Sequence, residues 1–136
     1  MSRLPRAQEY LKTGFTAEAA SAARLRALGA RAEREGRPNL ASSLRELAGE
    51  TDALAIVQSE AAEAIRRPAE ELDAQVVAVL AEERYENDAL YPKMARDADE
   101  ATASLFREVI ARQTEHAQRL ESLLDALSRA TADIPA

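Results

Sequence analysis

The residues best suited to chemistry in this chain are three glutamates and its only histidine, which interrupt apolar helical stripes. Each polar residue lies three or four positions from its apolar neighbours, so it points towards the core of a helical protein. The predicted stripes are Leu11, Phe15, Glu18, Ala22 and Leu25; Leu72, Val76, Val79, Glu83, Glu86 and Leu90; and Phe106, Val109, Gln113, His116, Leu120, Leu123 and Leu127. An inward carboxylate is costly unless it holds a proton or a cation, so the pattern indicates a metal site.

The candidate metal ligands are Glu18, Glu83, Glu86 and His116. Oxygen-rich ligation with one imidazole suits iron(II) or manganese(II). Metal sites in bundle cores combine glutamates on facing helices with Glu-x-x-His. Gln113 and His116 have that spacing, with an amide in place of the carboxylate.

A metal-free core is the alternative interpretation of the same residues. Glu83 and Glu86 could pair with arginines such as Arg24 or Arg26, and Gln113 could donate amide hydrogen bonds to them. A lone histidine on an apolar face is also commonly a hydrogen-bonded core residue. The stripes alone leave both interpretations open.

Composition favours one all-α domain over residues 1–136. The chain is rich in Ala, Leu, Glu and Arg, with 4 Gly, 5 Pro and 4% aromatic residues. A net charge of -6 with interspersed signs argues against a nucleic-acid partner. The lack of cysteine excludes disulfides and thiolate metal sites. No apolar run is long enough to span a membrane, so we expect a cytoplasmic protein.

Helix-breaking residues divide the chain into helices. Gly36 and Pro38 mark one turn, Pro68 marks a second, and the acidic run at 97–100 suits the start of a last helix. Pro92 predicts a kink near Tyr91. We expect four helices, at about residues 5–35, 39–65, 69–96 and 99–130. Their short connections predict an antiparallel four-helix bundle built from two helix pairs, 5–65 and 69–130.

Three short motifs in the second half carry a resemblance to a known family. They are Glu83-Arg84-Tyr85-Glu86, Leu90-Tyr91-Pro92 and Phe106-Arg107. They resemble the Glu-x-Tyr-Glu, Tyr-Pro and Phe-Arg elements of the rubrerythrin branch of the ferritin-like superfamily. Glu18 and the helix end at Glu35-Gly36 fit the first helix of that family, and the resemblance covers roughly residues 10–127.

The resemblance implies that Glu18, Glu83, Glu86 and His116 stand at ligand positions of a di-iron site. Three further ligand positions are replaced, by Thr51, Leu54 and Gln113. Four of seven ligands would hold two irons poorly, so we expect one iron or manganese ion per chain. Family members reduce peroxide, often with electrons from a rubredoxin domain that needs four cysteines. An active form of this chain would therefore need an external electron donor.

The sequence thus predicts a ferritin-like metal-binding protein with iron-dependent oxidase or peroxidase chemistry. If active, it would be a non-haem iron or manganese oxidoreductase. The alternative is a metal-free helical structural or interaction module, and the three replaced ligands favour it. Long helices with apolar flanks also predict a homodimer, and the short connection at Pro68 would permit exchange of helix pairs between chains.

Overall fold

The described part of the chain is entirely helical. The structure is a computed structural model that describes residues 3–66, 71–130 and 132–135. No strand occurs among these residues, so the predicted all-α class is confirmed. The chain divides into two compact units, Met1–Ala69 and Glu70–Ala136, which correspond to the two predicted helix pairs. The predicted connection at Pro68 lies outside the described residues.

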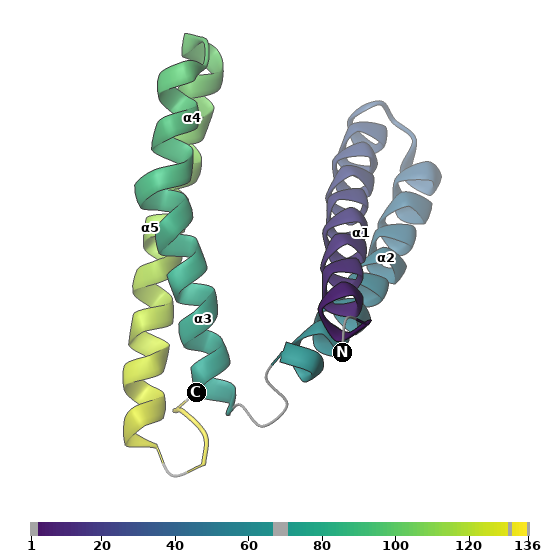
Figure 1. Cartoon of the computed structure of the whole chain (residues 1–136). Coiled ribbons are helices and arrows are strands. Elements are labelled where there is room, and N and C mark those ends of the chain that lie inside the picture. Colours follow the sequence, from purple (N-terminus) through teal and green to yellow (C-terminus); the bar gives the residue numbers. More distant parts are fainter. Residues whose placement is uncertain (1–2, 67–70, 131, 136) are drawn as a thin grey trace. The chain divides into compact units, whose positions relative to one another are not determined.

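The first unit is a helical hairpin of α1 (Arg3–Arg34) and α2 (Pro38–Arg66), as Figure 1 shows. α1 ends at the predicted glycine, since Gly36 has a φ of 76°, which a residue without a Cβ adopts freely. The backbone N–H of Arg37 donates to the Ala32 carbonyl at 2.9 Å, and that of Gly36 donates to Glu33 at 3.1 Å. These two bonds satisfy carbonyls at the helix end and reverse the chain.

Small residues form the contact between α1 and α2. Ala41, Ala48 and Ala55 are buried at seven-residue intervals along α2. A Cβ on Gly29 of α1 would lie 3.2 Å from the Arg45 Cγ, so the helices approach closely there. The heptad spacing keeps one narrow seam of each helix against the other, as in a coiled coil.

The second unit is also a hairpin, with one interrupted arm (Figure 1). α3 (Leu72–Tyr85), the π-helical turn η1 (Glu86–Leu90) and α4 (Tyr91–Asp97) follow one another where one helix was predicted. α5 (Glu100–Arg129) returns along them and begins at the last residue of the predicted acidic run. There the Asp99 carboxylate accepts a hydrogen bond from the Thr102 backbone N–H at 2.8 Å, which caps the helix.

The π-helical turn lies where the kink was predicted. The backbone N–H of Tyr91 donates to the carbonyl of Glu86, five residues earlier, instead of to the residue four earlier. Pro92 follows directly; it has no N–H, and its ring would clash with the carbonyl of Asp88 in a regular helix. The wider turn adds one residue to the helix and shifts the inward face after it.

The inward face of the interrupted arm differs from the predicted stripe. Leu80 and Asn87 are buried, and Val76, Glu83 and Tyr91 are half-buried. The prediction was wrong for Leu72, Val79 and Leu90, which are 71%, 47% and 38% exposed. Apolar residues stand on both sides of the stripe, so periodicity alone could not choose between adjacent positions.

The stripe of α5 is as predicted except at His116 and at Leu123, which is 41% exposed. Phe106, Val109 and Gln113 are half-buried, whereas His116 is exposed at the edge of the stripe. The Phe106 and Tyr91 rings lie 5.8 Å apart and hold α5 against the start of α4.

Candidate functional site

Two of the predicted metal ligands lie together in the second unit. Glu83 on α3 and His116 on α5 line one open pocket of 270 Å³. The other lining residues are Val79, Arg119, Leu120 and Leu123. The pocket therefore combines a carboxylate, an imidazole and a guanidinium with apolar walls.

The Glu83 carboxylate lacks a hydrogen-bond donor on its buried side. Its Oε2 atom is buried without a partner among the described residues, and so is Oε1 of Gln113. Buried polar atoms of native proteins are nearly always satisfied by protein, water or an ion. An acceptor oxygen of a carboxylate in this position suits a cation, and His116, at the exposed edge, can supply a nitrogen ligand.

The remaining predicted ligands are placed differently. Glu86 is half-buried at the start of η1, and Glu18 is half-buried on α1 in the first unit. Among the residues that the structure describes, no group of three or more His, Cys, Asp or Glu side chains could hold a metal ion. Of the four predicted ligands, Glu83 and His116 are thus the pair that shares a pocket.

Two of the replaced ligand positions offer nothing to a metal. The Thr51 hydroxyl donates to the Leu47 carbonyl at 2.8 Å, within its own helix. Leu54 is 56% exposed. The third replacement, Gln113, keeps a carbonyl oxygen at the helix contact.

Arg24 and Arg26 were proposed to pair with the glutamates in a metal-free core. Among the described residues, the structure gives no contact of either arginine with Glu83 or Glu86. Arg26 pairs with Asp52 within the first hairpin. On the second hairpin, Arg84 pairs with Glu121 and Arg107 pairs with Glu100, both at the surface. Arg119 lines the pocket with Glu83, so a salt bridge between them is the metal-free alternative that the pocket allows.

Sequence reasoning missed Asn87, a buried polar residue of the second hairpin. It is 8% exposed, and its Oδ1 atom has no hydrogen-bond partner among the described residues. Its position four residues after Glu83, on the same helical face, was the available signal. The predicted stripe instead placed the preceding residue, Glu86, on the inward face.

The two tyrosines of the family-like motifs differ in their surroundings. Tyr91 packs on Phe106. Tyr85 is 60% exposed.

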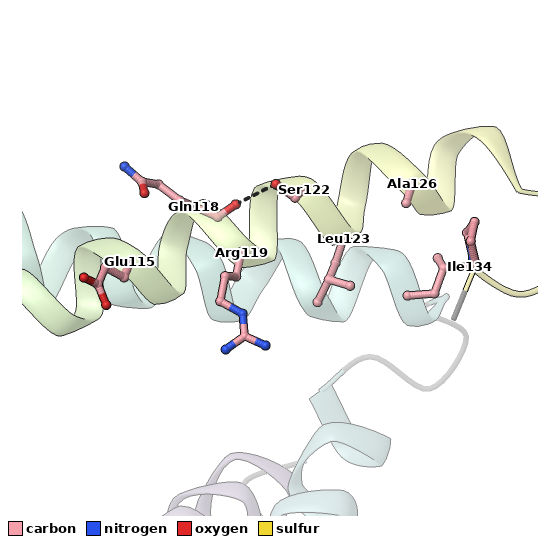
Figure 2. A pocket seen from close by; sticks show the side chains of 8 residues that line it. Glu115, Gln118, Arg119, Ser122, Leu123, Ala126 and Ile134 are labelled. Atoms are coloured by element: carbon pink, nitrogen blue, oxygen red, sulfur yellow. Dashed lines mark hydrogen bonds between the residues drawn. The ribbon is translucent and has the colours of Figure 1, made fainter.

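A larger pocket of 610 Å³ lies between α5 and the C-terminal residues (Figure 2). Leu123, Ala126 and Ile134 provide apolar surface, and Glu115 and Arg119 lie near one end. The Ser122 hydroxyl donates to the Gln118 carbonyl at 3.1 Å, within the same helix. This pocket contains one carboxylate and one guanidinium on adjacent turns, which is no metal site.

The described residues include no helix that is both long and apolar enough to cross a membrane. No protein-family model matches the chain, and no curated protein matches it. The arrangement of Glu83, His116 and the buried amides is therefore the basis on which a function can be argued.

Proposed function

We propose that this chain is a ferritin-like, rubrerythrin-related protein that binds one iron or manganese ion at a site that includes Glu83 and His116. The observation that supports this proposal is the buried, unpartnered Oε2 of Glu83, a residue that lines one pocket together with His116. A divalent cation would satisfy that oxygen and offset the cost of burying the carboxylate. The contribution of Glu18, in the first unit, stays a prediction, as does the antiparallel four-helix bundle.

The residues around the pocket suit a small oxidised substrate such as peroxide. Glu83 would hold the ion through an anionic oxygen and His116 through a neutral nitrogen, and the contribution of Glu86 stays a prediction. The bound ion would supply one-electron redox chemistry for an oxidase or peroxidase reaction, with electrons from an external donor. Val79, Leu120 and Leu123 line the pocket with apolar surface.

Metal loading of the full chain tests this proposal. Protein purified without a histidine tag is loaded with iron(II) or manganese(II), desalted and analysed for metal content. We expect about one ion per chain, and a loss of most of it in Glu83→Ala and His116→Ala. Glu82→Ala and Glu115→Ala are the matched controls, because each removes an exposed carboxylate one residue from a ligand.

A stability measurement gives an independent readout. A metal that binds only the folded chain adds about 2.7 kcal/mol at one hundred times its Kd. Addition of a chelator should therefore lower the Tm of the loaded protein, and metal should restore it. If the wild type retains no metal after loading and its Tm does not change when chelator is added, the proposal is wrong.

The second candidate function is a metal-free helical module that acts by binding another chain. Large exposed apolar side chains on the described helices favour it, among them Ile56, Val57 and Val77. Patches of this kind commonly mark protein contacts. The predicted homodimer would cover part of this surface in either function. Sedimentation at several concentrations separates a dimer from a monomer, and the metal content decides between the two functions.

A further inference from the structure

Three oxygen atoms in the second hairpin are buried without a hydrogen-bond donor among the described residues. They are Oε2 of Glu83 on α3, Oδ1 of Asn87 on η1 and Oε1 of Gln113 on α5. Asn87 is the most enclosed of the three side chains, at 8% exposure. A buried oxygen without a donor is costly, so each of the three calls for a partner.

The register of the hairpin places these three residues at a similar position along its long axis. Glu83 shares a pocket with His116, and two turns further along the same arm Tyr91 contacts Phe106. The two arms run in opposite directions, so Gln113 of α5 lies between these contacts, beside the turn from Glu83 to Asn87. Glu83 and Asn87 are four residues apart and share one face of their arm.

The π-helical turn separates Asn87 from the apolar residues that follow it. The hydrogen bond from Tyr91 N–H to the Glu86 carbonyl adds one residue after Asn87, so Tyr91 follows it on the inward face instead of Leu90. Asn87 is buried in the hairpin, about one turn after Glu83 and one turn before Tyr91. π-helical turns occur frequently at functional sites.

We propose that Asn87 is a further metal ligand, whose side-chain carbonyl oxygen binds the same ion as Glu83, with the Gln113 carbonyl oxygen opposite. This inference rests on the proposed function. Together with the His116 nitrogen, one carboxylate and two amide oxygens form a weakly charged ligand set, which suits manganese(II) or iron(II) and binds with modest affinity. In the competing arrangement, the two amides donate their N–H groups to Glu83 and no ion is needed.

Manganese(II) titration of the full chain, followed by electron paramagnetic resonance of the free ion, tests the assignment. Asn87→Leu keeps the side-chain size and removes the oxygen, so we expect manganese affinity to fall about tenfold or more. Asn87→Asp adds a charge at the same position and should raise the affinity severalfold. Asn39→Leu is the matched control, since Asn39 is exposed on α2, and it should leave binding unchanged.

The outcomes separate this inference from the proposed function. If Glu83→Ala loses manganese while Asn87→Leu and Asn87→Asp bind it as the wild type does, the Asn87 assignment is wrong and the proposed function stands. If the wild type binds no manganese, both are wrong. If Asn87→Leu does not fold, Asn87→Asp decides: tighter binding supports the assignment, and unchanged or weaker binding overturns it.

Discussion

Replacement of Leu80 by alanine tests which face of α3 is packed. Leu80 is 5% exposed and is the one large apolar side chain among the buried residues that the structure describes. Removal of a fully buried leucine side chain costs about 2–5 kcal/mol, from lost burial and the cavity that remains. The surrounding hairpin is thin and can partly close the cavity, so we expect about 2 kcal/mol, near the lower end of that range.

Leu72→Ala is the matched control, because it makes the same chemical change in the same helix at a position that is 71% exposed. Less than a third of that side chain is removed from solvent, so its loss should cost about 0.5 kcal/mol. For a chain of this length, 1 kcal/mol corresponds to about 3–5 °C in Tm. Leu80→Ala should therefore lower the Tm by roughly 6–10 °C and Leu72→Ala by roughly 2 °C.

Circular dichroism at 222 nm during heating and during guanidinium titration measures both variants. The slope of unfolding free energy against denaturant should stay equal to that of the wild type, which shows that the denatured state is unchanged. An equal or larger loss in Leu72→Ala would refute the reasoning. That result would indicate that the predicted stripe through Leu72, Val79 and Leu90 is the packed face of this arm.

Two further predictions concern local structure. Gly36→Ala should destabilise the chain by about 1 kcal/mol, because the φ of 76° at this position strains any residue with a Cβ. Gly49→Ala lies inside α2, where the added Cβ meets no atom within 4 Å, so it should stabilise the chain by about 0.5–1 kcal/mol. Equal Tm shifts in these two variants would contradict the assigned turn. Hydrogen bonds from the Thr102 backbone and hydroxyl lower the pKa of Asp99 below its usual 3.8, so this cap stabilises the fold above pH 3.8 and loses its effect as the pH falls through the lowered folded-state value. The Tm difference between wild type and Asp99→Ala should accordingly be largest near neutral pH and shrink towards pH 2, and a difference independent of pH would show that the carboxylate charge is irrelevant there.

The sequence by itself determined the helices and their ends. Gly36 ends α1, Asp99 begins α5, and Pro92 causes the interruption at η1, because each of these effects acts within one helical turn. The division into two helix pairs follows from the same local signals. These features depend on backbone geometry and on neighbours three or four residues away, which the order of the residues specifies directly.

Only the tertiary structure decided which side chains of the second hairpin face each other. Val79 and Leu80 are adjacent and both apolar, and Glu86 and Asn87 are adjacent and both polar, so the periodic pattern fits either choice. The position of α5 and the additional residue in η1 selected Leu80 and Asn87, and left His116 at the exposed edge beside Glu83. The physical reason is that burial depends on the register of a partner helix far away in the chain, which no local spacing encodes.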